Sequence, residues 1–337
     1  MSAGGNRGVL ERARALRHEG RHFALALVTD SEGSTYRKPG ALAVVAEDGQ
    51  RQGTLSGGCL EPALEQLAQR AMASGRAEAA VFDTLGDDDL LFGSGSGCRG
   101  RMRVLAWPVP ADAPQALLDL LLAAQAAGHD VELAVSVDAA RPGDAWAWSD
   151  GQHARLGTSI PDAAASWPHG LHENAGHPLA RLRIRAAPRL MLIGGGPEAP
   201  PLLRLAATLG WAATVADHRE GLLDPQRLAD ADRRLHARAA AALAEGPAPD
   251  AVLVMTHQAS ADLEALRALA TMPVPYVGLL GPPARRDELL ALLEPAGRDA
   301  LRARLRAPVG LPLGGEGPEA IALAIAADLQ RFFHAPG

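Results

Sequence analysis

Apolar and polar residues alternate in short blocks along the first 150 residues, and this pattern predicts a mixture of helices and strands. Apolar residues at helical spacing indicate amphipathic helices, and short apolar runs bounded by turn residues indicate buried strands. Asp48-Gly49 is typical of a hairpin turn. The expected helices cover 7–18, 60–73 and 108–127, and the expected strands cover 23–29, 41–46, 50–55, 79–83, 101–107, 131–137 and 145–148. We therefore expect an antiparallel-rich α+β domain over residues 1–150.

The pattern changes after residue 186, where strands and helices alternate to the end of the chain. The expected strands cover 189–193, 213–216, 250–255 and 275–280, and the expected helices cover 199–209, 262–270, 285–293 and 318–333. Such alternation indicates a parallel, doubly wound sheet, so residues 187–337 are expected to form a Rossmann-like domain and the fold class is α/β. Residues 151–186 are polar, rich in Pro, Gly and His, and aperiodic apart from one expected strand at 181–186. We expect a linker or edge segment there.

A glycine-rich turn follows the first strand of the second domain. Gly194-Gly195-Gly196-Pro197-Glu198-Ala199 fits G-x-G-x-x-A between a strand and a helix, as in dinucleotide-binding domains. Backbone N–H groups at the helix start are expected to bind a pyrophosphate, and Asp217 to accept a hydrogen bond from a ribose hydroxyl. His218 and His257 each follow a strand end, where ligands bind in such sheets. A scaffold without nucleotide fits the same pattern.

Length, charge and cysteine content exclude several classes of protein. A chain of 337 residues favours two domains, and a net charge of -6 with a pI near 6.0 disfavours binding to nucleic acid or an anionic membrane. No apolar run is long enough to span a membrane, and the start lacks a signal-peptide core. Two cysteines exclude a secreted disulfide framework, so we expect a cytoplasmic protein with reduced thiols.

Two further features concern anions and metals. The loop from Gly33 to Gly40 holds Ser34, Arg37 and Lys38, and Lys38 is the only lysine of the chain. Arginine and lysine bind phosphate well, although a solvated hairpin tip would have the same composition. We expect no metal site, because His169, His172 and His177, three histidines close together in the 151–186 segment, have no carboxylate or thiol partner at a fixed spacing.

Both cysteines lie in glycine-rich segments, where a ligand can approach the sulfur and the backbone. Cys59 follows Ser56-Gly57-Gly58 and precedes a helix, with Glu61 in its first turn. Cys98 precedes three arginines at 99, 101 and 103. Cations stabilise a thiolate more than a helix start that Glu61 opposes. We therefore expect Cys98 to be the more acidic thiol and Cys59 the better-placed ligand contact.

These motifs occur together in one known family. The sequence resembles the XdhC/CoxI family, accessory proteins that mature molybdenum hydroxylases such as xanthine dehydrogenase. The resemblance covers both domains. It rests on Gly33 to Ala41, Leu55 to Glu61, Gly97 to Gly100, Gly194 to Ala199, Asp217-His218-Arg219, Thr256-His257 with Asp262, Gly278 to Gly281, Gly310-Leu311 and Pro318-Glu319.

The resemblance implies a cofactor-binding maturation chaperone more than a turnover enzyme. Such a protein binds molybdenum cofactor (molybdopterin or its dinucleotide form), takes part in replacing an oxo ligand by a sulfido ligand supplied through a cysteine desulfurase, and delivers the cofactor to an apo molybdenum hydroxylase. The formation of a homo-oligomer is left as an open alternative. Cys59 and Cys98 would carry the sulfur chemistry. The expected cofactor-binding residues are Ser34, Arg37, Lys38, Ser56, Gly57, Gly58, Cys59, Glu61, Gly194, Gly195, Gly196, Asp217, His218, Arg219 and His257. The alternatives are an NAD(P)-dependent oxidoreductase and a non-binding docking scaffold.

Overall fold

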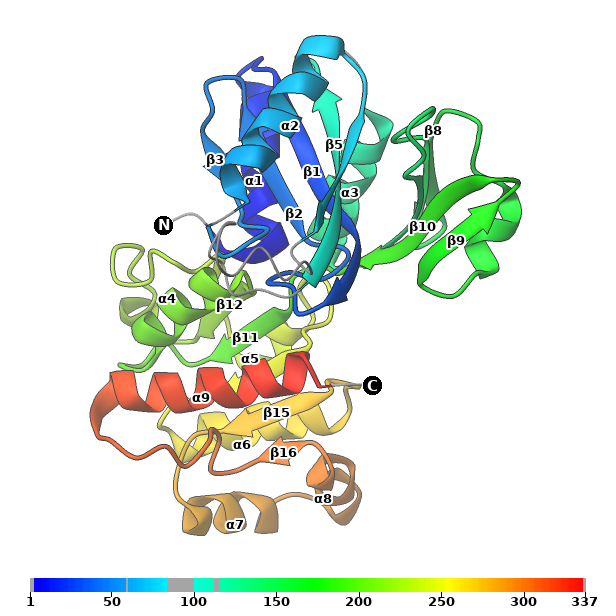
Figure 1. Cartoon of the computed structure of the whole chain (residues 1–337). Helices are drawn as coiled ribbons and strands as arrows, with labels where there is room; N and C mark the ends of the chain where they lie inside the picture. Colours follow the sequence, from blue (N-terminus) through cyan, green and yellow to red (C-terminus); the bar gives the residue numbers. More distant parts are fainter. Residues whose placement is uncertain (1–2, 59, 84–99, 112–114, 336–337) are drawn as a thin grey trace. The chain divides into compact units, whose positions relative to one another are not determined.

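The computed structural model describes residues 3–58, 60–83, 100–111 and 115–335. Within these ranges the chain divides into two compact units, one made of residues 4–186 and one that holds residues 187–337 (Figure 1). No described helix is both long enough and apolar enough to cross a membrane.

The first unit contains two antiparallel sheets of five strands each and three helices. The first sheet has the order β3 (Arg51–Gln52), β2 (Leu42–Ala46), β1 (Phe23–Gly33), β5 (Gly100–Val109) and β4 (Glu78–Asp83). The second sheet has the order β8 (Gln152–Leu156), β7 (Ala145–Ser149), β6 (Val131–Ser136), β10 (His177–Ile184) and β9 (Gly170–Asn174). The helices are α1 (Gly5–His18), α2 (Glu61–Ser74) and α3 (Ala116–Ala127).

Strand β1 is buried on both faces because helices cover both sides of its sheet. Leu25 and Leu27 point into a core shared with α1, α3 and the second sheet. Ala26 and Val28 point to the opposite face and pack against α2. Successive side chains of a strand face opposite sides, so two covered faces explain why this strand is a continuous apolar run.

Three expectations for this unit need correction. Residues 151–186 do not form a linker, because they supply β8, β9 and β10 of the second sheet; β8 and β9 agree with the alternative expectation of an edge segment. Strand β1 continues past Thr29 to Gly33, since Ser31, Glu32 and Gly33 pair with the start of β5. The helix expected over 108–127 begins only at Ala116, because Pro108 and Val109 still belong to β5.

The second unit is a six-stranded parallel sheet between two layers of helices. The strand order is β13 (Arg233–His236), β12 (Ala212–Asp217), β11 (Arg189–Ile193), β14 (Ala251–Val254), β15 (Tyr276–Leu279) and β16 (Leu305–Arg306). All five strand pairs are parallel. In chain order this is 3-2-1-4-5-6, the Rossmann arrangement. The predicted α/β class with a C-terminal Rossmann-like sheet is therefore confirmed.

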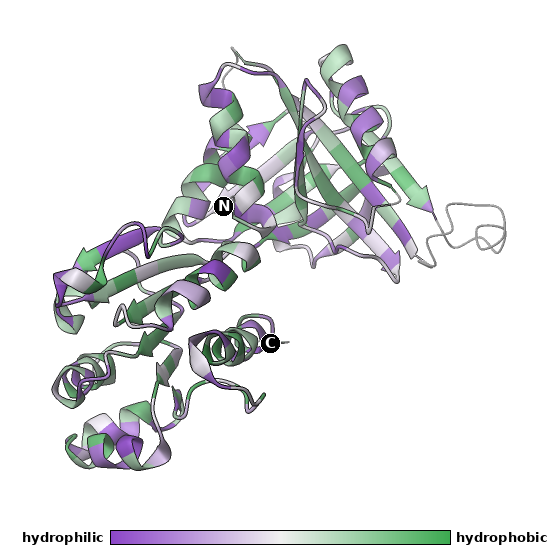
Figure 2. Ribbon diagram, turned by 90° about the vertical axis from the view of Figure 1, so that its left-hand side faces the viewer, coloured by the Kyte–Doolittle hydropathy of each residue, from purple (hydrophilic) through white to green (hydrophobic). Residues whose placement is uncertain are grey.

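Each face of this parallel sheet has its own helices. Leu190 and Leu192 of β11 face α4 (Ala199–Leu209) and α9 (Gly317–Phe333). Met191 and Ile193 face the other layer, which consists of α5 (Ala239–Leu243), α6 (Ala259–Ala270), α7 (Pro283–Ala291) and α8 (Pro295–Arg302). In Figure 2 the strands are largely hydrophobic, whereas the helices mix hydrophobic and hydrophilic residues, as amphipathic helices do.

Candidate functional site

Three of the sequence motifs meet at one pocket of the first unit. The pocket is lined by residues from the segment after β1, from the segment before α2, from β4 and from the start of β5: Ser34, Thr35, Tyr36, Leu55, Ser56, Gly57, Leu60, Phe82, Gly100 and Met102. Gly100 is required there, because a Cβ at this position would collide with the carbonyl oxygen of Ser34 and lie 2.8 Å from Thr35 Cγ2. The fold therefore brings together segments that are more than sixty residues apart in sequence.

A buried pair, Ser56 and Glu61, fixes the segment before α2. The Ser56 N–H donates to Glu61 Oε1 at 3.0 Å, and the Ser56 hydroxyl donates to Glu61 Oε2. The same hydroxyl oxygen accepts from the N–H groups of Gly58 at 3.3 Å and Leu60 at 3.0 Å. One serine and one glutamate thus satisfy three backbone N–H groups and hold the turn that leads into α2.

Charge and space at this turn follow from these contacts. Burial acts to raise the pKa of Glu61, but the hydrogen bonds from the Ser56 hydroxyl and N–H outweigh it and hold the pKa below its ordinary value. Glu61 is therefore an ionised acceptor whose oxygens face Ser56. Gly58 has a φ of +114°, which favours glycine, and a Cβ there would meet no atom of the described residues within 4 Å.

The basic residues Arg37 and Lys38 directly follow the pocket residues Ser34, Thr35 and Tyr36 in the sequence, and the two basic side chains differ in exposure. Lys38 is exposed, and its ammonium group lies 3.2 Å from Thr35 Oγ1 and 3.4 Å from the Gly33 carbonyl oxygen. Arg37 is partly buried, and burial lowers the pKa of its guanidinium group. Within the described parts of the chain, neither side chain has a carboxylate partner. Cys59 and Cys98 lie outside the described residues.

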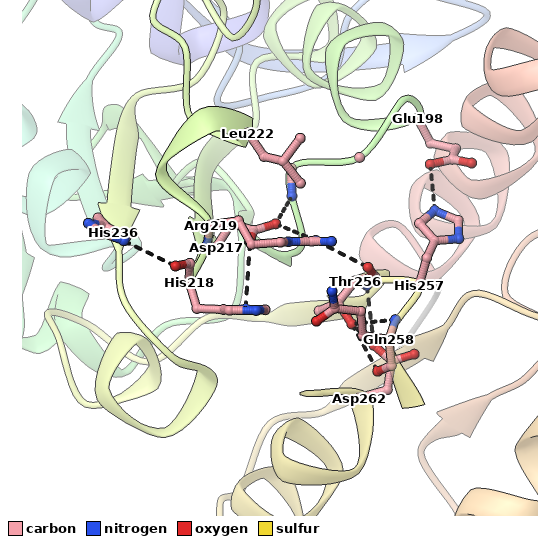
Figure 3. A network of polar contacts seen from close by, with 12 residues as sticks. Glu198, Asp217, His218, Arg219, Leu222, His236, Thr256, His257, Gln258 and Asp262 are labelled. Atoms are coloured by element: carbon pink, nitrogen blue, oxygen red, sulfur yellow. Dashed lines mark hydrogen bonds and ion pairs between the residues drawn. The ribbon is translucent and has the colours of Figure 1, made fainter. Parts of the chain in front are cut away.

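The second group of predicted site residues lies at the carboxyl ends of β11, β12 and β14, where the strand order reverses (Figure 3). Asp217 ends β12, and its carboxylate is fully buried. Oδ1 accepts from the N–H and the Nε–H of Arg219, and Oδ2 accepts from Arg219 Nη2 and from the Gly195 N–H, each at 2.9 Å. Burial acts to raise the pKa of Asp217, but these donors hold it below its ordinary value.

Backbone atoms of neighbouring segments fill the space around the glycine-rich turn after β11. A Cβ at Gly194, where φ is +123°, would collide with the carbonyl oxygen of Met255, and one at Gly195 would lie 2.5 Å from the carbonyl oxygen of Leu222. Arg227 donates to the carbonyl oxygens of Gly195 at 2.5 Å, Gly196 at 3.2 Å and Leu222 at 2.5 Å. Sequence reasoning missed Arg227, because nothing near it in the chain indicates that it reaches this turn.

A histidine and a glutamate face each other across the same strand ends. His257 Nε2 lies 3.1 Å from Oε2 of Glu198, whose side chain is buried, whereas the His257 side chain is half exposed (Figure 3). His257 has a φ of +59°, which is uncommon for a residue other than glycine. A Cβ at Gly196 would lie 3.2 Å from Glu198 Oε2 and 3.3 Å from His257 Cδ2, so this glycine leaves room for the pair.

The remaining polar groups at these strand ends are tied into one network. Thr256 donates through its hydroxyl to Asp262 Oδ1 at 2.5 Å, and Asp262 Oδ2 accepts from Arg285 at 2.6 Å. Arg219 also donates to the Thr256 carbonyl oxygen at 3.1 Å. His218 lies 3.6 Å from Asp217 Oδ1. The structure therefore brings the predicted residues from 194 to 257 together at one edge of the sheet.

The three histidines considered for a metal site each contact a different group. His169 Nε2 lies 2.9 Å from Glu132 Oε2, and His177 Nδ1 lies 2.6 Å from Asp138 Oδ2. His172 Nε2 lies 2.8 Å from a backbone carbonyl oxygen. Among the residues that the structure describes, no cluster of three or more His, Cys, Asp or Glu side chains could hold a metal ion.

Comparison with known families gives two matches along the chain. Residues 16–83 match the XdhC and CoxI family, and residues 190–329 match the XdhC Rossmann domain. The first match contains the Ser34 loop and the Ser56–Glu61 turn. The second contains the strand ends that hold Asp217 and His257.

Individual relatives agree with these matches. A Bacillus subtilis (strain 168) protein, named as a probable subunit of xanthine dehydrogenase, is 30% identical over 325 residues, with 94% of each chain covered. A crystal structure titled as a xanthine dehydrogenase from Bacillus halodurans superimposes with a TM-score of 0.80 at 29% identity, over 97% of this chain and 96% of that one. The uncharacterised Escherichia coli (strain K12) protein YqeB is 36% identical over 155 residues, which cover 44% of this chain and 28% of YqeB.

Proposed function

This chain belongs to the XdhC and CoxI family, and on that premise we propose that it is an accessory protein that binds molybdenum cofactor, supports its sulfuration and delivers it to an apo molybdenum hydroxylase of the xanthine dehydrogenase type. A cysteine desulfurase would supply the sulfur, and Cys59 and Cys98 are the residues to which we assign the sulfur chemistry. The names of the Bacillus relatives support a xanthine dehydrogenase as the partner.

The observation that carries this proposal is the convergence of three motif segments on the pocket of the first unit. Ser34, Ser56 and Gly100 come from different segments, yet all three line it. Gly100 lets the Ser34 backbone pack close to β5, and Ser56 holds the Gly57-Gly58 backbone, so the three segments form one pocket wall that a ligand can approach closely.

The chemistry of the surrounding residues fits a phosphate-bearing cofactor. Arg37 and Lys38 supply positive charge, and within the described ranges neither is neutralised by a carboxylate. A partly buried guanidinium group with a lowered pKa gains free energy when an anion reaches it. Ser34 and the backbone at Gly57 and Gly58 would hold the polar edge of the ligand. When bound, the cofactor supplies the molybdenum centre that is sulfurated.

In this proposal Ser56 and Glu61 do not contact the cofactor through their polar side-chain atoms. Both Glu61 oxygens accept from Ser56, and the Ser56 hydroxyl oxygen accepts from two backbone N–H groups. Their role is to position the Gly57-Gly58 backbone. They differ in this respect from Lys38, whose ammonium group is exposed.

The proposal is tested by cofactor retention. Cofactor released from a molybdenum enzyme under anaerobic conditions is mixed with the protein, unbound cofactor is removed by filtration, and the pterin in the retained fraction is measured by fluorescence after oxidation. We expect the parent chain to retain it, and Lys38→Ala and Arg37→Ala to weaken retention at least about tenfold, the loss of one charge-assisted contact of about 1.4 kcal/mol.

The matched control is Arg76→Ala, which removes an exposed arginine of the same unit away from the three segments. It should retain cofactor as the parent does. Retention by the parent no better than by an unrelated protein would refute the proposal and favour a docking scaffold. Equal loss in all three variants would show that only overall charge matters.

A further inference from the structure

In proteins that bind NAD or NADP on a Rossmann sheet, the ribose is held by the acid at the end of the second strand. Here that acid is Asp217. A carboxylate has about four acceptor positions, and Asp217 uses four: two for the backbone and Nε of Arg219, one for Arg219 Nη2 and one for the Gly195 N–H. A ribose hydroxyl would have to displace a donor from a carboxylate that is closed to solvent.

The pyrophosphate of a dinucleotide would bind the N–H groups at the start of α4. Prolines at 197, 200 and 201 have no N–H to offer there. The Gly195 N–H donates to Asp217, and the Ala199 N–H donates to the Gly196 carbonyl oxygen at 3.2 Å. Between 195 and 201, only the N–H groups of Gly196 and Glu198 remain for a ligand.

Charge at the same position opposes a pyrophosphate as well. The buried Glu198 carboxylate belongs to the N-cap residue of α4, at the helix start where an anionic ligand would lie. The guanidinium group of Arg227 is used by the carbonyl oxygens of Gly195, Gly196 and Leu222, where it holds the backbone in place. A dinucleotide would therefore meet a carboxylate and a fixed backbone.

We infer that the strand-end crevice of this Rossmann unit does not bind NAD(H) or NADP(H), because the groups that would hold the ribose and the pyrophosphate are bonded to each other. The Asp217–Arg219–Gly195 arrangement acts as an internal brace that joins β11 to β12. This inference rests on the second unit alone and does not depend on the proposed function.

The test uses the full-length chain with NADH and NADPH as probes. Each is titrated to about 1 mM and binding is followed by the change in nicotinamide fluorescence, with a known NADH-dependent dehydrogenase as positive control. In parallel, hydrogen exchange is measured for peptides within 190–220 and 250–262, with and without probe. We expect no saturable binding and unchanged exchange in these peptides.

Two results would support the inference and one would overturn it. Absence of saturation supports it, and so does saturation that leaves exchange at 190–220 unchanged, because the probe would then be held elsewhere. Saturation below about 1 mM with slowed exchange in both peptides would overturn it. Since molybdenum cofactor is not present in this experiment, its outcome is independent of the cofactor-retention assay.

Discussion

Replacing Glu61 with glutamine tests whether the Ser56–Glu61 pair requires a carboxylate. The Ser56 hydroxyl oxygen already accepts from Gly58 and Leu60, so its hydrogen must point to Glu61. A carboxylate accepts with both oxygens, whereas a glutamine presents one oxygen and one NH₂ group. If the glutamine oxygen keeps the Ser56 N–H, its NH₂ group faces a hydroxyl that is also a donor.

The magnitude follows from the number of bonds lost. Two hydrogen bonds reach the Glu61 carboxylate, and bonds to charged groups contribute about 1.5–3 kcal/mol each. Glu61→Gln keeps the bond from the Ser56 N–H and replaces the bond from the Ser56 hydroxyl with a donor–donor contact. The site is closed to solvent, because Glu61 is only 5% exposed. We expect the free energy of unfolding of the first unit to fall by about 2 kcal/mol.

The pH dependence has a definite sign. The pKa of Glu61 is lower in the folded state than its ordinary value of 4.5, so its ionised form stabilises the fold. This contribution is fully present above pH 4.5 and is lost as the pH falls through the lower, folded-state pKa. The difference in stability between the parent and Glu61→Gln should therefore be constant from pH 6 to 8 and shrink in acid.

The assay is urea unfolding combined with hydrogen exchange of peptides within 51–75, since two units need not unfold together. Glu65→Gln is the matched control. Glu65 lies one turn further along α2 and pairs with Arg51 at 2.8 Å, but its side chain is 38% exposed. It should lose less than about 1 kcal/mol. Equal losses in both variants, or a Glu61→Gln loss that persists unchanged in acid, would refute the reasoning.

Two further variants test buried contacts. Tyr276→Phe removes the hydroxyl that donates to buried Asp328 at 2.8 Å, and thermal unfolding should show a loss of about 1–3 kcal/mol; an unchanged midpoint would mean that Asp328 finds another donor. Gly100→Ala should weaken cofactor retention, because its Cβ would push the Ser34 backbone away. Gly57→Ala is the control and should not disturb the fold, since its Cβ would meet a described side-chain atom only at 3.9 Å. A Gly100→Ala protein that retains cofactor like the parent would show that the Ser34 segment can move freely.

Sequence patterns predicted the second unit well wherever local signals mark an element. Strand β11 and helix α4 have the predicted bounds, because an apolar run precedes the glycines and Gly210 ends the helix with a φ of +79°. The short strands β13 and β16 were missed. Arg233-Arg234-Leu235-His236 is polar because it forms an edge of the sheet, so hydrophobic pattern cannot reveal it.

The errors in the first unit have a different cause. Strands β8 and β9 and the first half of β10 contain histidines, a proline and arginines. They are ordered by pairing rather than by their own pattern: β8 pairs with β7, β10 with β6, and β9 with β10. The same limit applies to Glu61. In the sequence it is an acid that opposes a thiolate at a helix start, and only the fold shows that both of its oxygens turn back to Ser56.

The glycines of the two motif regions look alike in the sequence but have different structural reasons. A side chain at Gly194 would collide with Met255, and one at Gly195 would crowd Leu222, so these glycines allow parts of the protein to pack against each other. A Cβ at Gly58 would meet nothing within 4 Å among the described residues, yet the backbone is held there by Ser56. A backbone that is held by a side chain and is not crowded by any described residue is the arrangement that a ligand needs. The contrast therefore favours the first unit over the Rossmann crevice as the site of the cofactor binding that we propose.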